Sequence, residues 1–285
     1  MLQQQTVDGI EWSYSDRGPK QAEVLLVLPG ALGAIDLAGA VLDGLAGDRR
    51  VVALAYPAVP TMTALCDGIV GLLDRLAISR ADVLGSSLGG YVAQCLVRRH
   101  PDRVGHLVLS HTFVLGPRDA RRFRLANRIS AWIPAPLFRA LLRVRLRSVL
   151  RPLARAGRRE DVDALLRSAA VGSLTAATVA RFNDWMMEGA LAFPITPHDL
   201  AGHGGGVMII ESGDDPVIRP RDRAALRAAY PAARVCTFRG GGHATSLVMP
   251  DAYARAVTAF LDGTTPSGCN PPRAMGRGAL RQAPA

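Results

Sequence analysis

A serine between two glycines is the position in this sequence best suited to covalent chemistry. An apolar run enters at residues 83–84, and Ser87 follows in the spacing Gly85-x-Ser87-x-Gly89. This spacing is typical of a nucleophile elbow, where a strand turns sharply into a helix and the serine stands at the turn. Residues two before and two after the serine must be small, because the turn brings the backbone close to its neighbours.

Ser86 is the alternative nucleophile at this turn. It would place Gly85 only one residue before the serine, which breaks the small-x-Ser-x-small spacing, so the pattern favours Ser87. The serine also excludes the nucleophilic aspartate that dehalogenases and epoxide hydrolases use at this position.

An acid and a histidine follow Ser87 in the order that a hydrolase of this type requires. The buried-strand pattern at 207–210 leads into Asp214 and Asp215, and the strand-like run 235–238 leads into three glycines and His243. The sequence therefore predicts a triad of Ser87, Asp215 and His243. Asp214 stays open as an alternative acid one residue away.

Several other histidines, one tryptophan, two methionines and the cysteines could also do chemistry, but the sequence favours a structural role for them. His111 follows a strand near the expected cleft and is interpreted as a polar lining or core residue, while the spacing of His198 and His203 predicts no metal site. Trp185, Met186 and Met187 are expected to be core or pocket lining. The four cysteines are scattered without disulfide or zinc spacing, so we expect free thiols.

Strand-like and helix-like segments alternate along most of the chain. Strands are predicted at 24–28, 51–54, 82–85 and 104–109, and helices at 37–46, 62–77 and 88–99. Short apolar strands separated by helices predict an α/β fold: a mostly parallel central sheet with helices on both faces. Active residues belong at the carboxyl ends of such strands, where Ser87, Asp215 and His243 all fall.

The strand pattern stops between about 113 and 200. We interpret 1–112 and 201–263 as the core, 113–200 as an inserted helical cap, and 264–285, rich in Pro, Gly and Arg, as a disordered tail. No apolar run is long enough to span a membrane, and the N-terminus has no secretory pattern, so a cytoplasmic location is expected.

Arginine dominates the net charge of +10 and recurs every four residues in the cap, at 139, 143, 147 and 151. An anionic membrane surface, an acidic carrier protein or an anionic substrate could meet this stripe. A solvated face is the favoured interpretation, because arginine replaces lysine almost everywhere in the chain. No nucleic-acid-binding motif accompanies the charge, and no nucleic-acid partner is expected.

The sequence resembles the α/β-hydrolase fold superfamily over residues 7 to about 262, and within it the maspardin-like branch, most clearly over 11–115. The resemblance rests on Trp12-Ser13-Tyr14, Gly18-Pro19-Lys20, Leu28-Pro29, Ala55-Tyr56-Pro57, Cys66-Asp67-Gly68, Leu72-Leu73-Asp74 and Ser87-Leu88-Gly89-Gly90. Animal maspardin is regarded as a binding protein without a standard acid and histidine. This sequence carries both residues, in Asp215-Pro216 and His243.

These residues predict a cofactor-free serine hydrolase that acts on a carboxylic ester or thioester of small-molecule size. Ser87 would attack the acyl carbonyl, with His243 as base and Asp215 as its orienting partner. The backbone N–H groups of Ala31 and Leu88 would hold the oxyanion. A non-catalytic maspardin-like binding protein, and a lyase or cofactor-free haloperoxidase on the same fold, are the alternatives.

Overall fold

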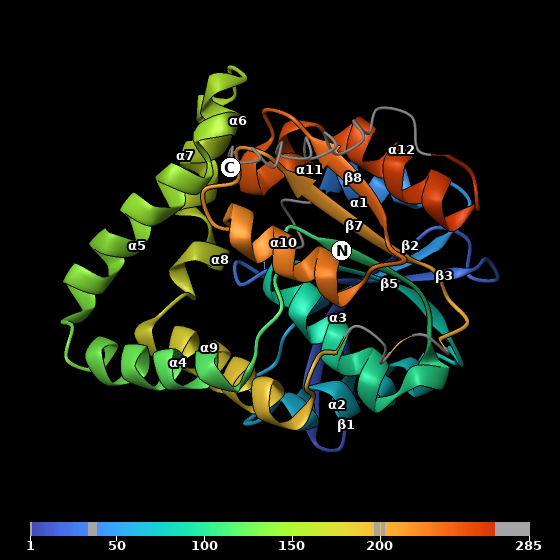
Figure 1. Ribbon diagram of the computed structural model, residues 1–285, viewed down its shortest axis with the longest axis horizontal. Helices are drawn as coiled ribbons and strands as arrows, with labels where there is room; N and C mark the ends of the chain where they lie inside the picture. The colour runs from blue at the N-terminus through green and yellow to red at the C-terminus, as the bar shows by residue number, and fades with distance from the viewer. Residues whose placement is uncertain (1, 34–38, 197–199, 201–202, 266–285) are drawn as a thin grey trace, which may run out of the picture.

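The computed structural model describes residues 2–33, 39–196, 200 and 203–265, and its centre is an eight-stranded sheet (Figure 1). The strand order is β1-β2-β4-β3-β5-β6-β7-β8. The strands are β1 (Gln3–Val7), β2 (Ile10–Arg17), β3 (Val24–Leu28), β4 (Arg50–Ala55), β5 (Ala81–Ser86), β6 (Val104–Ser110), β7 (Val207–Ser212) and β8 (Arg234–Phe238). All neighbours from β4 to β8 are parallel, which confirms the predicted fold class.

The N-terminal strands were not predicted from the sequence. β1 pairs with β2, and β2 with β4, both antiparallel. In β2 the buried Trp12 and Tyr14 alternate with the less buried Glu11 and Ser13, the period of two that a strand with one covered face requires. That alternation is the signal from which the hairpin could have been found.

Helices cover both faces of the sheet (Figure 1). One face packs against α1 (Gly39–Leu45) and α12 (Pro250–Leu261), and the other against α2 (Met62–Arg75), α3 (Leu88–Arg99) and α10 (Pro220–Ala229). The central strands β3 and β4 are apolar over residues 24–28 and 51–55, because both of their faces are buried between these layers.

Between β6 and β7, where the sequence predicts a cap, the described residues form six helices. They are α4 (Pro117–Ser130), α5 (Ala135–Val149), α6 (Arg151–Arg155), α7 (Arg159–Arg167), α8 (Ala169–Gly172) and α9 (Ala176–Ala192). In the part of the chain that the structure describes, no helix is long and apolar enough to cross a membrane.

The cap helices are attached to the core in two different ways. The C-terminal half of α9 is fixed to the core: Trp185 Nε1 donates to the Val59 carbonyl at 3.0 Å, and the Glu188 carboxylate accepts from the backbone N–H of Met62 at 2.6 Å. By contrast, α5 to α7 form a separate apolar cluster that reaches the core through Ala244. Trp185 is fully buried, as a core residue should be.

The structure tests the expectation of free cysteines, whereas most of the predicted tail lies outside the described residues. Cys66 and Cys95 are buried free thiols, but Cys236 is disulfide-bonded, so the expectation of free thiols is wrong at that position. Scattered spacing in sequence cannot exclude a bridge, because the fold decides which cysteines meet. The predicted tail, 264–285, lies outside the described residues from 266 onward.

Candidate active site

Ser87 stands at the junction between β5 and α3 with a backbone that few non-glycine residues adopt. Its φ is +54° and its ψ is −116°, and it is the N-cap residue of α3. Two hydrogen bonds hold this conformation: the Ser87 N–H donates to the Ser110 carbonyl at 2.9 Å, and the Thr112 hydroxyl donates to the Ser87 carbonyl at 2.7 Å. Such strain persists only where the surroundings enforce it, and strained residues of this kind cluster at active sites and ligand-binding turns.

The glycines around Ser87 are required by close backbone packing. A Cβ on Gly89 would lie 2.1 Å from the Leu28 carbonyl oxygen, and a Cβ on Gly85 would lie 2.4 Å from the Gly89 carbonyl oxygen. No L side chain fits at either position without moving the backbone. The small-x-Ser-x-small spacing is therefore a packing condition of this turn, and Ser87 is the residue that satisfies it.

His243 and Asp215 complete a hydrogen-bonded chain that ends at Ser87. His243 Nε2 is 3.1 Å from Ser87 Oγ, and His243 Nδ1 is 2.9 Å from Asp215 Oδ2. A carboxylate can only accept, so Nδ1 carries the proton and Nε2 is left to accept from the serine hydroxyl. This is the tautomer in which imidazole can act as a general base toward Ser87.

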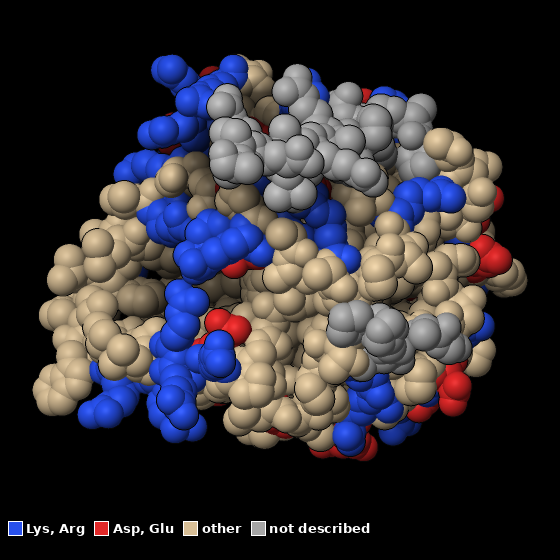
Figure 2. All heavy atoms as spheres, viewed as in Figure 1, with Lys and Arg blue, Asp and Glu red and all other residues tan. Residues whose placement is uncertain are grey.

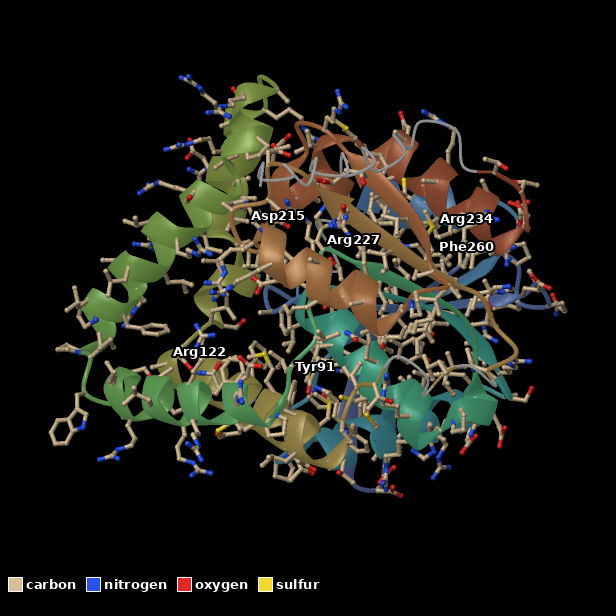
Figure 3. The ribbon with its side chains drawn as sticks, viewed as in Figure 1. Tyr91, Arg122, Asp215, Arg227, Arg234 and Phe260 are labelled. Carbon is tan, nitrogen blue, oxygen red and sulfur yellow. The ribbon has the colours of Figure 1, made fainter. Side chains whose placement is uncertain are left out.

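Asp215 is fixed and kept ionised by its surroundings. Its other oxygen, Oδ1, accepts from the backbone N–H groups of Val217 at 2.7 Å and Ile218 at 3.0 Å. Burial raises the pKa of Asp215, but the hydrogen bond and charge of His243, together with these two N–H groups, outweigh burial and lower the pKa. Asp215 lies at the end of β7 that faces the cap helices (Figure 3).

The two alternatives left open by the sequence occupy different places. Asp214 is exposed and accepts only a 3.3 Å hydrogen bond from the Gly242 N–H, whereas Asp215 is buried against His243. Ser86 is still part of β5, paired in register with Ser110, and His243 Nε2 meets Ser87 instead. The geometry selects Ser87 and Asp215 over their neighbours.

The two backbone groups predicted to form an oxyanion hole flank Ser87. Leu88 is the first residue of α3, so its N–H has no partner within the helix. Ala31 lies in a tight turn closed by a 2.9 Å hydrogen bond from the Gly33 N–H to the Gly30 carbonyl, which leaves the Ala31 N–H outside the turn bond. A Cβ on Gly30 would lie 3.3 Å from Ser87 Cβ, so this turn passes directly against the serine.

A largely apolar cavity of about 360 Å³ opens beside Ser87 and His243. The turn at Gly30–Gly33, the loop after His243 and the inner face of α5 line it, and among the described lining residues Arg145 is the only arginine or lysine. A volume of this size suits a small ligand, and its walls suit an apolar group.

A buried polar network lies behind His243, and the sequence did not reveal its extent. His111 lies 6.0 Å from His243, ring centre to ring centre. Its Nδ1 is 3.0 Å from Ser110 Oγ, and its Nε2 is 3.0 Å from both Ser212 Oγ and Thr245 Oγ1. Thr245 in turn donates to the Gly242 carbonyl at 3.0 Å, which ties the network to the residue that precedes His243.

The proton positions in this network follow from that last bond. Because Thr245 donates its one hydroxyl proton to Gly242, it must accept from His111, so His111 Nε2 carries a proton and Nδ1 accepts from Ser110. Burial lowers the pKa of His111 to about 3, with the neighbouring His243 as a further cause. His111 is therefore a neutral, fully hydrogen-bonded core residue, consistent with the structural interpretation given to it.

The other predicted histidines lie away from this site. His203 hydrogen-bonds to the Gly105 carbonyl at 2.7 Å, near the opposite ends of the strands, and His198 lies outside the described residues. Among the residues that the structure describes, no group of three or more His, Cys, Asp or Glu side chains could hold a metal ion.

Known proteins resemble this chain in sequence, some of them over only part of its length. Human maspardin is 35% identical over 106 residues, which is 36% of this chain and 34% of maspardin, so the likeness to the maspardin-like branch is confirmed over about a third of each protein. That stretch is too short to contain both Ser87 and His243, which are 156 residues apart. The dihydrolipoyllysine-residue acetyltransferase component of the acetoin cleaving system of Cupriavidus necator is 28% identical over 90% of this chain and 68% of its own.

Solved structures agree with the architecture. The esterase RhEst1 from Rhodococcus sp. ECU1013 superposes with a TM-score of 0.72 at 19% identity, over 92% of this chain and 98% of the esterase, a likeness that shows the fold. The family model described as "alpha/beta hydrolase fold" matches residues 23–250, which include Ser87, Asp215 and His243. With the strained serine turn, the parallel sheet and this match over most of its length, the chain belongs to the alpha/beta hydrolase fold family.

Proposed function

We propose that this protein is a serine hydrolase that cleaves a carboxylic ester or thioester through an acyl-enzyme. The observation that carries the proposal is the hydrogen-bonded chain from Asp215 through His243 to Ser87 at the mouth of an apolar cavity. Family membership and hydrolase relatives support hydrolysis in general. The ester or thioester bond, the catalytic roles and a cytoplasmic location are the finer parts of this proposal.

In the first half-reaction Ser87 Oγ attacks the acyl carbonyl and transfers its proton to His243 Nε2. Asp215, ionised at neutral pH, stabilises the imidazolium that forms. The carbonyl oxygen becomes an oxyanion, which the N–H groups of Leu88 and Ala31 hold, and the positive end of α3 favours the same charge. His243 then returns the proton to the leaving alcohol or thiol.

In the second half-reaction water attacks the acyl carbonyl and gives a proton to His243. The bond between the acyl carbon and Ser87 Oγ then breaks, His243 returns the proton to Ser87 Oγ, and the carboxylic acid leaves. The cavity beside Ser87 is lined mainly by aliphatic side chains, which favours an apolar acyl or alcohol part of limited size. No step in this sequence of events requires a cofactor.

The test is hydrolysis of p-nitrophenyl esters of increasing acyl length by the native protein, Ser87→Ala and Ser86→Ala. We expect turnover by the native protein and by Ser86→Ala, and a loss of about 10³-fold or more in Ser87→Ala. Equal losses in both variants, or turnover that survives in Ser87→Ala, would contradict the role of Ser87.

A binding protein without turnover is the second candidate, favoured by the likeness to maspardin. Reaction with a serine-directed fluorophosphonate separates the two candidates, because it needs an activated Ser87 and no knowledge of the substrate. Labelling of the native protein that is absent in Ser87→Ala supports the hydrolase. A folded native protein that neither labels nor turns over any ester supports the binding role.

A further inference from the structure

The exposed large apolar side chains of this protein gather at one corner of the cap. We define the cap tip as residues 125–144, the end of α4, the turn and the first part of α5. Of the exposed large apolar residues in the described chain, all but Leu2 and Leu191 belong to it: Leu125, Ile129, Trp132, Leu137, Leu141 and Val144, between 51% and 88% exposed. This corner projects from the body of the molecule at the left of Figure 1.

The cap tip is exposed because each of its helices is anchored elsewhere. α4 lies along α9, where Asn127 Nδ2 donates to the Asp184 carboxylate at 2.8 Å, and its Leu125 and Ile129 point elsewhere. α5 is buried only at its C-terminal half, through Leu146 and Val149. The apolar arc of α5 is thus wider than the part that the fold covers.

Arginines surround this apolar corner almost without acidic partners. Residues 117–151 contain ten arginines and a single acid, Asp119. Within the described chain, Arg122 alone among these ten forms an ion pair, at 3.6 Å to Asp119. Figure 2 shows the uncharged surface of the tip at the left edge, with blue arginine groups above and below it.

On α5 the apolar and basic residues lie on separate sides. Leu137, Leu141 and Val144 follow a spacing of four and three residues, which places them on one side of the helix. Arg139, Arg143 and Arg147 recur every four residues and lie on another side. A helix with this division lies along a membrane surface, with its apolar side among the acyl chains and its arginines at the phosphates.

We propose that the cap tip docks on a membrane surface that contains anionic phospholipids. Charge complementarity selects this occupant: a second copy of the chain would bring the same arginines and repel, whereas each arginine near an anionic surface adds to binding. An acidic protein would meet the charge as well. It does not explain Trp132, a residue type enriched at the headgroup level, exposed to 88% in the turn between the two helices.

The same helix connects the docking surface with the active site. Arg145, Leu146 and Val149 of α5 line the cavity beside Ser87, as does Leu150, the residue that follows the helix. If the proposed hydrolase function holds, docking would bring the ester of a lipid to this cavity, so this part alone rests on that function. The docking itself does not.

Trp132 provides a direct readout, because the other two tryptophans, Trp12 and Trp185, are fully buried. Vesicles of phosphatidylcholine, with or without about a third of phosphatidylglycerol, are added to the full-length protein at low salt. We expect a blue shift of tryptophan emission with the anionic vesicles only. Trp132→Phe should remove the shift, and an unshifted native spectrum would overturn the proposal.

Vesicle co-sedimentation measures which residues carry the binding. We expect Arg139→Gln/Arg143→Gln/Arg147→Gln to lower the vesicle partition coefficient about 100-fold, and Leu137→Ser/Leu141→Ser to lower it about tenfold. The matched controls, Arg75→Gln/Arg239→Gln/Arg255→Gln and Leu2→Ser, change exposed residues outside the cap and should bind nearly as the native protein does.

Three results would overturn the proposal. The first is that the control arginine substitutions weaken vesicle binding as much as the cap arginine substitutions do. The second is that the native protein self-associates without lipid and Leu137→Ser/Leu141→Ser abolishes this association, and the third is that the protein binds an acidic carrier protein and no vesicles. Ser87→Ala keeps the readouts separate: it should bind vesicles like the native protein while it hydrolyses no ester. A loss of hydrolysis thus tests the proposed function, and a loss of vesicle binding tests the docking surface.

Discussion

The carboxyl edge of the sheet and the cap tip are built in opposite ways. At the sheet edge hydrogen bonds fix the candidate catalytic residues: Ser110 and Thr112 hold the backbone of Ser87, and two backbone N–H groups and His243 hold the Asp215 carboxylate. At the cap tip the large apolar side chains defined above are each more than half exposed to solvent. Fixed geometry serves bond chemistry, whereas an unsatisfied surface serves contact with something outside the chain.

The largest effect on activity should come from replacing Asp215, and the adjacent Asp214 provides its control. We expect Asp215→Asn to lower kcat/KM for a p-nitrophenyl ester about 10⁴-fold, because an amide at this position disfavours the His243 tautomer that can act as base. Asp214→Asn is the matched control. Its side chain is exposed and contacts the Gly242 N–H instead of the His243 ring, and an amide oxygen can still accept that hydrogen bond, so kcat/KM should stay within about twofold. If Asp214→Asn were the more damaging of the two, the acid would have been assigned to the wrong residue.

Much of this edge could be predicted from the sequence, because local rules determine it. The elbow spacing around Ser87 reflects a steric condition, and apolar runs mark buried parallel strands whose ends meet at one edge. The sequence predicted Asp215 as the acid and left Asp214 open as an alternative. Two adjacent aspartates on a loop have the same chemistry, and only the structure shows where each side chain points. The structure separates them through burial and the contact with His243.

The hydrogen-bonded network of His111 and the cap tip could not be predicted. Ser212 and Thr245 lie more than 100 residues from His111 in the chain, and only the fold brings them to it, whereas Ser110 is its neighbour in sequence. In the cap the sequence indicated an arginine stripe at 139, 143, 147 and 151. It could not indicate that Leu137, Leu141 and Val144 are exposed while Leu146 and Val149 are buried, because the exposure of a side chain depends on which neighbours the helix packs against.

The steric condition at the elbow predicts the largest change in stability. Gly89→Ala places a Cβ about 2 Å from the Leu28 carbonyl oxygen, so we expect the free energy of unfolding to fall by about 3 kcal/mol. Equilibrium denaturation in urea measures this change. Gly47→Ala, where nothing lies within 4 Å of the added Cβ, should change it by less than about 0.5 kcal/mol. Similar values for both variants would show that the backbone at the elbow can relax.

The buried histidine behind the triad predicts a dependence of stability on acid. Burial lowers the pKa of His111 to about 3, so between its ordinary pKa of 6.5 and that value the unfolded chain binds a proton that the folded protein does not. Stability is therefore complete above pH 6.5 and falls as the pH drops, by up to about 1.4 kcal/mol for each pH unit.

His111→Asn isolates this contribution. Asparagine does not titrate, can hydrogen-bond, and tolerates the φ of +46° found at this position. The difference in unfolding free energy between native protein and variant should shrink by about 2 kcal/mol from pH 7 to pH 5. The acid Asp215 does not interfere in this range, because its lowered pKa confines its effect to lower pH. A difference that stays constant with pH would mean that folding leaves the pKa of His111 unshifted.

Substitutions at the cap tip should have the smallest effect on the free energy of unfolding. That small effect would distinguish the cap tip from the packed part of the same helix. Leu141 and Leu146 belong to the same helix, but Leu141 is 53% exposed and Leu146 only 7%. We expect Leu146→Ala to cost about 2 kcal/mol in unfolding free energy, and Leu141→Ala at most about 0.5 kcal/mol. If Leu141 adds almost nothing to the stability of the fold, and its replacement by serine weakens vesicle binding, then its contribution is to docking on the membrane surface. A cost for Leu141→Ala as large as that for Leu146→Ala would place this leucine within the packed cap instead.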